Sequence, residues 1–245
     1  MKESRSQTPR FYVAAALRAG GSCELPEDTA HHAVHVLRIR SGEEVILFNG
    51  RGGEYPARIS SINRLKIGVD VLEHRAIERE SPLRVVLVQG VSSGERMEFT
   101  IRKAVELGVA EIHPVLAAGS VARPKGERAE GRRSHWQKVV IAACEQCGRN
   151  RIPEVLPLIA VADYRPGQGA KILLSPSSRA PLSKLSFDES QFMLAAGPEA
   201  GFTEEEEARL VEAGFVPASL GPRVLRTETA AVAALAAMNA LRGDS

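Results

Sequence analysis

Two glycine-containing turns near the C-terminus carry the strongest structural signal in this chain. The first reads Ala195-Ala-Gly-Pro-Glu-Ala-Gly-Phe-Thr203, and the second reads Leu220-Gly-Pro-Arg-Val-Leu-Arg-Thr-Glu-Thr-Ala230. Each turn follows an apolar segment and leads into a predicted helix. Glycine leaves the neighbouring backbone N–H and C=O groups without a shielding Cβ, so the backbone alone can hold a flat polar ligand. The pair therefore indicates a ligand site.

Neither turn contains the G-x-G-x-x-G run that opens a dinucleotide-binding βαβ unit. This argues against a conventional dinucleotide site or a class I methyltransferase site. Taken alone, Gly197–Gly201 is equally well explained as an ordinary strand-to-helix loop. Arg226 adds a fixed cation just before a helix and beside the two loops, and Thr227 is the expected N-cap of that helix.

Around these turns, the second part of the chain alternates between strands and helices. Strands are expected at Leu83–Gln89, Glu111–Leu116, Val155–Ala160, Lys171–Leu174 and Gln191–Ala196, and helices at Arg96–Leu107, Ser134–Cys147, Thr203–Ala213 and Thr227–Leu241. The helix at Thr203 begins with a capping box, Thr203-Glu-Glu-Glu206. Alternating strands and helices predict an α/β domain with a parallel sheet covered by helices on both faces.

The first part of the chain is rich in short strands instead. Strands are expected at Phe11–Ala16, Glu44–Phe48, Glu54–Ile59 and Lys66–Val71, with one helix at 29–37. This pattern predicts a small β-barrel. The charged stretch that follows ends at Ser81-Pro82 and is typical of a linker. We therefore expect a barrel domain at 1–72, a linker at 73–82 and an α/β domain at 83–245.

The composition is that of a globular protein, with 44% hydrophobic and 25% charged residues among 245. Only 4% of residues are aromatic, which argues against a broad platform for stacking single-stranded bases. The net charge of +2 neither requires nor excludes a nucleic-acid partner. Three cysteines are too few for a disulfide framework, and no apolar leader or membrane-spanning run is present, so we expect a cytoplasmic protein.

The two turns resemble the cofactor site of SPOUT-class RNA methyltransferases, and in particular of the enzymes that methylate N3 of a uracil in 16S rRNA. Matching segments extend over nearly the whole chain: Arg10-Phe-Tyr12, Val36-Leu-Arg-Ile-Arg-Ser-Gly42, Gly94–Val109 and Ala142–Pro153. The resemblance implies a PUA-like RNA-binding barrel followed by a SPOUT domain with a trefoil knot. It also implies S-adenosylmethionine as cofactor, the 16S rRNA of the small ribosomal subunit as partner, a homodimer, and no metal.

The resemblance also implies roles for individual residues. The expected cofactor-binding residues are Leu174, Leu194, Ala195, Gly197, Pro198, Glu199, Gly201, Leu220, Gly221, Leu225 and Arg226. The expected RNA-binding residues are Arg10, Arg38, Arg40, Arg96, Lys103, Gln146 and Arg149. In catalysis, Arg226 can stabilise the uracil anion, and either Glu199 or Glu145 can accept the N3 proton. One residue departs from the usual family sequence: Ala200 occupies a position that is commonly glycine.

Three further motifs have competing interpretations. Cys144 and Cys147 have the spacing of a metal or redox pair, but no second cysteine pair completes a zinc site, so we expect packing residues. His31 and His35 share a helical face without a third ligand, and we expect that helix to serve packing. The run Arg123–Arg133 carries a charge of +3 and is expected to be a solvated loop that can contact RNA.

Two alternative functions stay open at this point. One is methylation of a ribose 2′-oxygen, as in other SPOUT proteins, because the spacing of the turns does not distinguish a base from a ribose. The other is an RNA-binding or ribosome-assembly module without catalysis, which only Ala200 favours. In either case the expected partner is RNA.

Overall fold

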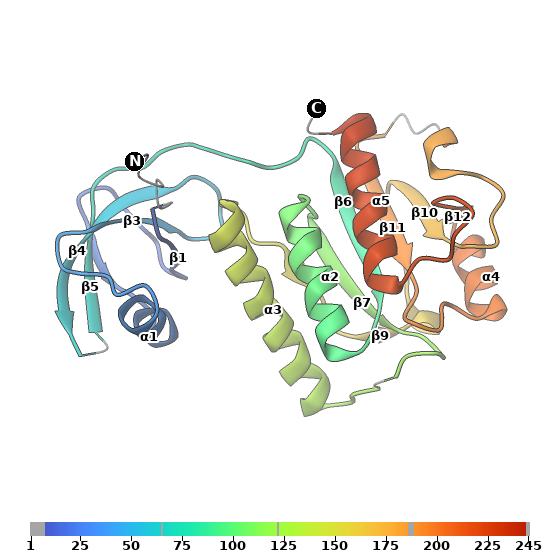
Figure 1. Cartoon of the computed structure of the whole chain (residues 1–245), viewed down its shortest axis with the longest axis horizontal. Helices are drawn as coiled ribbons and strands as arrows, with labels where there is room; N and C mark the ends of the chain where they lie inside the picture. Colours follow the sequence, from blue (N-terminus) through green and yellow to red (C-terminus); the bar gives the residue numbers. More distant parts are fainter. Residues whose placement is uncertain (1–7, 65, 122, 186–188, 244–245) are drawn as a thin grey trace, which may run out of the picture. The chain divides into compact units, whose positions relative to one another are not determined.

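The computed structural model describes residues 8–64, 66–121, 123–185 and 189–243, and these form two compact units (Figure 1). The first unit contains the residues up to Glu80 together with Cys144–Ile152. The second contains Ser81–Ala143 and the residues from Pro153 onward. The sequence assigned Cys144–Ile152 to the C-terminal domain, so its place in the first unit differs from the expectation.

The first unit is a mixed sheet with one helix. Its elements are β1 (Arg10–Tyr12), β2 (Ser22–Glu24), α1 (Glu27–His35), β3 (Glu44–Phe48), β4 (Tyr55–Asn63) and β5 (Lys66–Val71). The strand order is β1-β3-β4-β5-β2, and only the β1–β3 pair is parallel. Among the described strands, β1 and β2 lie at the two ends of this order and do not pair. The described strand pairs therefore form one mixed, five-stranded sheet.

Alternation along the strands builds the core of this unit. In β5, Ile67, Val69 and Val71 are buried while the residues between them are more exposed. They join the same apolar cluster as Ala30 and Ala33 of α1. A strand with one buried and one wetter face is what period-2 patterning predicts.

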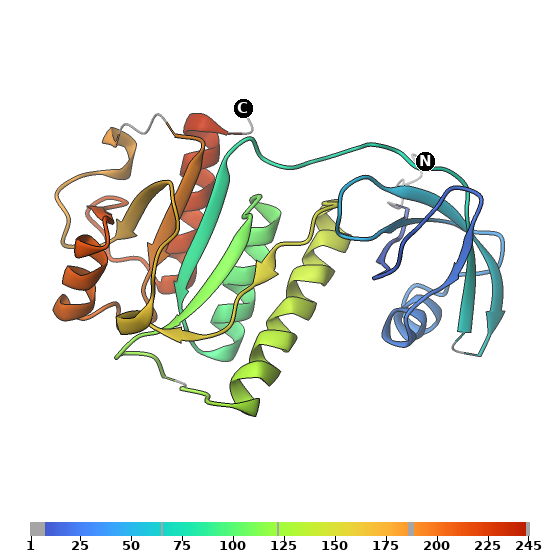
Figure 2. The ribbon, with the colours of Figure 1, turned by 180° about the vertical axis from the view of Figure 1, so that it is seen from behind.

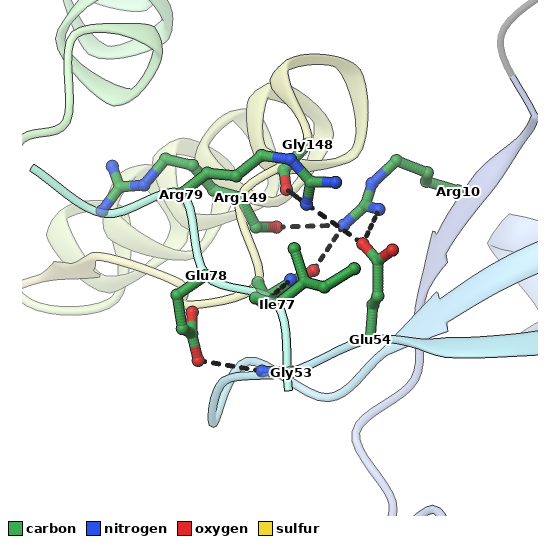
Figure 3. Close-up of polar contacts among 9 residues, drawn as sticks. Arg10, Gly53, Glu54, Ile77, Glu78, Arg79, Gly148 and Arg149 are labelled. Atoms are coloured by element: carbon green, nitrogen blue, oxygen red, sulfur yellow. Dashed lines mark hydrogen bonds and ion pairs between the residues drawn. The ribbon is translucent and has the colours of Figure 1, made fainter. Parts of the chain in front are cut away.

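Residues 73–80 are bound to the first unit and do not form a free linker. Arg75 and Glu54 exchange two backbone hydrogen bonds, at 2.9 and 2.8 Å. The Gly53 amide donates to Glu78 Oε1 at 2.9 Å (Figure 3). In these contacts the backbone of Arg75 and the charged side chain of Glu78 both bind the first unit.

The second unit is a parallel sheet with helices. Its elements are β6 (Arg84–Gly90), α2 (Gly94–Glu106), β7 (Glu111–Leu116), α3 (Glu127–Cys147, whose last four residues belong to the first unit), β8 (Glu154–Val155), β9 (Ile159–Ala160), η1 (Val161–Asp163), β10 (Ala170–Leu174), η2 (Leu182–Lys184), β11 (Gln191–Ala196), α4 (Glu204–Glu212), β12 (Val216–Ala218) and α5 (Thr227–Arg242). The strand order is β12-β10-β11-β6-β7-β8, with β9 also paired to β7, and every pair is parallel.

Helices cover both faces of this sheet, as the alternation of elements predicted. On one face, Val86 of β6 lies opposite Met193 of β11, and both join a cluster with Leu210 of α4 and Phe215. The other face is covered by α2 and α5, which pack against each other. Figure 1 shows α2 and α5 in front of the central strands, and Figure 2 shows the strands in front.

Two local predictions differ from the structure. The α3 helix begins at Glu127, so most of the stretch Arg123–Arg133 is helical and the predicted loop is wrong. Acidic Glu127 and Glu130 lie in its first turn, where they interact favourably with the helix dipole. The strand expected at Val155–Ala160 is split in two, because Pro157 lacks the N–H that a continuous ladder needs.

Candidate cofactor pocket and its surroundings

The two glycine turns form one cavity in the second unit, with a volume of about 430 Å³. A third loop, Leu174–Ser177 after β10, lines it together with Ala196–Phe202 after β11 and the loop from Ala218 to Leu225 after β12. Since β10, β11 and β12 are parallel neighbours, their carboxyl ends deliver all three loops to one edge of the sheet. The volume lies within the range of about 300–1,000 Å³ that is usual for small-molecule sites.

The loop after β11 can pack this closely only because side chains are missing. A Cβ at Gly90 would lie 2.4 Å from Pro198 Cδ, and a Cβ at Gly197 would lie 2.9 Å from the Phe202 nitrogen. Gly201 has a φ of 75°, a left-handed conformation that favours glycine. Ala200 is not among the residues with positive φ, so its methyl group causes no backbone strain.

A buried amide and a hydroxyl group fix this loop to the start of α5. The Thr227 hydroxyl donates to the Gly197 carbonyl at 2.6 Å, and Gln89 Nε2 donates to the Thr227 hydroxyl oxygen at 3.2 Å. Because Thr227 turns inward, it is not the N-cap that the sequence predicted. Arg226 occupies that position and makes no side-chain capping bond.

The Glu199 side chain is held at the N-terminal end of α2. Its Oε1 accepts a hydrogen bond from the Ser93 amide at 2.8 Å and lies 3.4 Å from Arg96 Nη1. Partial burial alone would raise the pKa of this carboxyl group. The hydrogen bonds, chiefly that of the Ser93 amide, and the positive charge of Arg96 outweigh burial and leave the Glu199 pKa below its usual value. Glu228 at the start of α5 lies 4.0 Å from the same guanidinium group.

Most of the predicted cofactor-binding residues line the cavity. Those that do so are Leu174, Gly197, Pro198, Glu199, Gly201, Leu220, Gly221 and Leu225. Leu194 and Ala195 are fully buried in β11 and lie behind the lining, and Arg226 is exposed beside it. Within the described chain the Arg226 guanidinium group makes no ion pair, so its charge is not neutralised.

Sequence reasoning missed several polar residues of the cavity. Ser175, Ser177, Glu204, Glu207 and Arg223 all line it. The Ser175 hydroxyl group donates to Glu207 Oε2 at 3.2 Å. The position of Ser175 directly after a predicted buried strand was the available signal, since strand ends carry the ligand residues in parallel sheets.

Comparison with known protein families identifies the class of protein. A model of the RNA methyltransferase domain matches residues 79–239. The chain belongs to this family. A model of the RNA methyltransferase PUA domain matches residues 25–72. Both the SPOUT-type α/β domain and the PUA-like domain implied by the resemblance are thereby confirmed, whereas the threading of the knot remains a prediction.

Relatives of this RNA methyltransferase match most of its length. Ribosomal RNA small subunit methyltransferase E of Buchnera aphidicola subsp. Schizaphis graminum is 32% identical, and the match covers 98% of this chain and 99% of that protein. The protein of the same name from Bacillus subtilis is 32% identical, over 89% of this chain and 91% of that protein. The family match thus includes both predicted domains.

Solved structures agree with this assignment. The crystal structure of a ribosomal RNA small subunit methyltransferase E from Neisseria gonorrhoeae, bound to S-adenosyl methionine, matches with a TM-score of 0.89 and 40% identity, covering 97% of this chain and 99% of that one. A putative methyltransferase from Legionella pneumophila, in complex with the bound cofactor SAM, matches with a TM-score of 0.94 and 36% identity, covering 98% and 100%.

Two predicted RNA contacts of the methyltransferase are buried in the first unit. Arg10 donates to Glu54 Oε2 at 2.7 Å and to Asn150 Oδ1 at 2.5 Å. Arg149 pairs with Glu80 at 2.5 Å, and its carbonyl accepts from Arg10 (Figure 3). The exposed fractions of the Arg10 and Arg149 side chains are 4% and 5%. The structure therefore places these two guanidinium groups in a structural network, where they do not face solvent.

Other predicted RNA contacts are accessible. Arg38 and Arg40 are exposed on either side of buried Ile39, and Arg38, three residues after the end of α1, has a φ of 55°. Gln146 is exposed at the end of α3. Lys103 is half-buried and pairs with Glu106 at 2.8 Å, the i,i+3 pair expected on a helix.

The remaining candidate groups belong to the first unit. Glu145 accepts a hydrogen bond from the Tyr12 amide at 3.0 Å, and burial raises its pKa. Burial raises the pKa of the Cys144 thiol to about 12, and its Sγ donates to the Arg151 carbonyl at 3.6 Å. Among the described residues no group of three His, Cys, Asp or Glu side chains could hold a metal ion. No helix in the described ranges is long and apolar enough to cross a membrane.

Proposed function

We propose that this protein transfers the methyl group of S-adenosylmethionine to N3 of a uridine in 16S rRNA of the small ribosomal subunit. The observation that carries the proposal is the cavity formed by the two glycine turns, in a chain that belongs to the RNA methyltransferase family. The relatives named after the small-subunit rRNA supply the substrate class. A cytoplasmic location and a homodimer accompany this proposal.

The residues of the cavity fit S-adenosylmethionine. The compact turn at Gly197–Gly201, the left-handed Gly201 and Gly221, and the apolar Leu174, Leu220 and Leu225 would hold it through backbone groups and apolar contacts. When bound, this cofactor supplies an electrophilic methyl group on a sulfonium ion, so no metal is required. The protein contributes alignment of the acceptor nitrogen, which can account for a large part of the rate.

The uracil N3 must lose its proton. The chain offers two carboxylates that could accept this proton and one guanidinium group that could stabilise the resulting anion. We propose that Arg226 stabilises the uracil anion, because its charge is exposed beside the cavity and is not neutralised by a described residue. The lowered pKa makes the Glu199 carboxylate a weak proton acceptor. Its Oε1 already accepts the Ser93 amide and pairs with Arg96. This supports a role for Glu199 in positioning the loop. Glu145 has the raised pKa expected of a general base and stays the candidate for proton transfer.

The exposed residues Arg38, Arg40 and Gln146 stay the candidates for RNA contacts outside the cavity. The buried Arg10 and Arg149 instead support the shape of the first unit. A non-catalytic RNA-binding module was favoured only by Ala200, and the part of this argument that needs backbone strain loses its basis because Ala200 has no positive φ.

The proposal is tested by methylation of hypomethylated small ribosomal subunits with isotope-labelled S-adenosylmethionine. The rRNA is digested to nucleosides, and mass spectrometry identifies the labelled product. We expect 3-methyluridine as the only labelled nucleoside. A labelled 2′-O-methyl nucleoside would show that the protein methylates a ribose and not a base. The absence of label, with protein that is folded and binds the cofactor, would contradict an enzymatic role.

A further inference from the structure

A basic groove with a volume of about 620 Å³ lies along the first half of α3 in the second unit. Its lining includes Arg123 in the segment before α3, Arg128, Arg132 and His135 on α3, and Gly94 at the start of α2. A second recess, lined by Arg123, Arg128 and Lys125 among others, shares two of these arginines and extends the groove. We call this surface the basic groove.

The basic side chains of α3 are arranged on one face of the helix. Arg128, Arg132 and His135 are separated by four and three residues, which places them above one another on an α-helix. Successive charges four residues apart are separated by about 6 Å along the helix axis. The helix therefore presents two arginines and a histidine in one row, and not an isolated basic side chain.

The charges of this row are available to a partner. Arg133, on a different face of α3, is paired with Glu130 at 2.7 Å. In contrast, neither Arg128 nor Arg132 has an ion pair with any described residue. Two acidic side chains line the groove: Glu127 in the second recess, and Glu98, which lies 2.9 Å from His135 Nε2. The groove thus keeps a positive charge that the protein itself does not neutralise.

The floor of the groove is open to a bulky ligand. A Cβ built at Gly94 or at Gly131 would meet no atom within 4 Å. Trp136, which is 3% exposed, forms a rigid base beneath this surface. A chain of phosphate groups could therefore approach the helix backbone between the arginines.

One wall of the groove is joined to α4, and the other is joined to the loop after β11 that lines the cofactor pocket. Arg123 donates to the Ala118 carbonyl, and the Ala118 amide donates to Glu206 Oε1 at 2.6 Å in the first turn of α4. On the other wall, Gly94 follows Ser93, whose amide donates to Glu199 of the pocket at 2.8 Å. Two hydrogen-bonded paths therefore connect the groove with elements that border the cofactor cavity.

We propose that the basic groove binds the phosphodiester backbone of the RNA substrate next to the nucleotide that receives the methyl group. This inference rests on the proposed function. A row of unneutralised arginines, an open floor and continuity with the cofactor pocket fit an extended polyanion better than a single small anion. The groove would supply affinity for the RNA and fix its position along the protein, whereas the cofactor pocket would select the uridine.

The decisive experiment measures methylation kinetics and its salt dependence on hypomethylated small subunits. The double variant Arg128→Gln/Arg132→Gln should raise KM on the order of tenfold, equivalent to about 1.4 kcal/mol. It should also reduce the slope of log affinity against log salt concentration by about 0.7–0.9 for each lost phosphate contact. The value of kcat and the calorimetric affinity for S-adenosylmethionine should not change.

Glycine variants separate the effect of charge from that of bulk. Gly131→Glu places a carboxylate in the groove and should raise KM, whereas Gly131→Gln adds similar bulk without charge and should have a much smaller effect. Gly167→Glu is the matched control, because Gly167 is exposed, has ordinary φ, has open space at its Cβ and does not line the groove. Circular dichroism confirms that each variant is folded.

The failure of this inference is distinguishable from the failure of the proposed function. Unchanged KM and salt slope in the arginine variant, with an active wild-type enzyme, would overturn the groove assignment alone. Equal effects of Gly131→Glu and Gly131→Gln would overturn its electrostatic basis. If the wild-type protein methylates no small subunits, fluorescence anisotropy with a labelled single-stranded RNA still tests the groove. Equal RNA affinity of wild-type and Arg128→Gln/Arg132→Gln protein would then exclude it.

Discussion

Replacing Glu54 by glutamine tests whether the buried polar network holds the first unit together. The Glu54 carboxylate accepts hydrogen bonds from Arg10 at 2.7 Å and from Arg79 at 3.0 Å, and its side chain is 3% exposed. Glutamine preserves the volume and one acceptor but removes the charge, so the guanidinium group of Arg10 is left buried without a counter-ion. Breaking a buried ion pair in this way typically costs about 3–5 kcal/mol.

Amide hydrogen exchange followed by mass spectrometry measures this loss within the first unit. At about 1.4 kcal/mol per factor of ten, the peptides of β4 and β5 should exchange roughly 10²–10⁴ times faster in Glu54→Gln than in the wild type. Tryptophan fluorescence does not serve here, because Trp136 belongs to the second unit. Peptides of β6 and β11 provide the internal reference.

The matched control is Glu44→Gln in the neighbouring strand. Glu44 pairs with Arg58 at 3.3 Å, but the two side chains are 70% and 53% exposed. Exposed pairs contribute only about 0.2–1 kcal/mol. If Glu54→Gln exchanged no faster than Glu44→Gln, the network would not stabilise this unit and the reasoning would be refuted.

The same pair of variants has a defined pH dependence. Burial alone would raise the pKa of Glu54, but the hydrogen bonds and charges of Arg10 and Arg79 lower it below its usual value in the folded state. The stabilisation is therefore complete above the unfolded pKa of about 4.3 and is lost as the pH falls through the lower folded pKa. The difference between wild type and Glu54→Gln should accordingly shrink in that acidic range.

Three further predictions concern the second unit and the thiols. Arg226→Ala should lower the rate of single-turnover methylation on the order of a hundredfold, and Arg226→Lys should restore it poorly. The free energy of unfolding should change by no more than about 0.5 kcal/mol. A near wild-type rate would remove Arg226 from the mechanism. Gly221→Val should weaken calorimetric binding of S-adenosylmethionine in folded protein, because Gly221 has a φ of 113°, and undiminished affinity would contradict the pocket assignment. Cys144 should resist alkylation at pH 8 in native protein, because its pKa is about 12, and a Cys144→Ser/Cys147→Ser variant should keep most activity without stoichiometric zinc.

The sequence predicted the pocket well because its determinants are local. Glycines at 197, 201 and 221 follow apolar strands, and the capping box at Thr203 forms as expected, with Glu206 donating its amide to the Thr203 hydroxyl oxygen at 3.2 Å. Such features need only a few neighbouring residues. The family resemblance added the identity of the ligand, which spacing alone does not define.

The errors arose where distant segments meet. Arg10 and Arg149 look like RNA-binding cations, yet each has a carboxylate partner far away in the sequence, at Glu54 and Glu80. No local pattern reveals such a pair. The same contacts explain why Cys144–Ile152 belongs to the first unit. A deletion of residues 1–72 would therefore remove Arg10 and Glu54 from this network, and it is a poor test of domain independence.

The first unit is discontinuous in the sequence, and this affects how the protein folds during its synthesis on the ribosome. Strands β1–β5 leave the exit tunnel early, but Arg149 and Asn150 are made 70 residues after Glu80 has been added. At about 5–20 residues per second, this interval lasts roughly 4–14 s. During that time Arg10 and Glu54 have each other but lack Asn150, while β6, α2 and β7 are already being synthesised. The N-terminal unit therefore reaches its final form only after part of the C-terminal unit exists, so the two units mature in overlapping periods and not strictly one after the other.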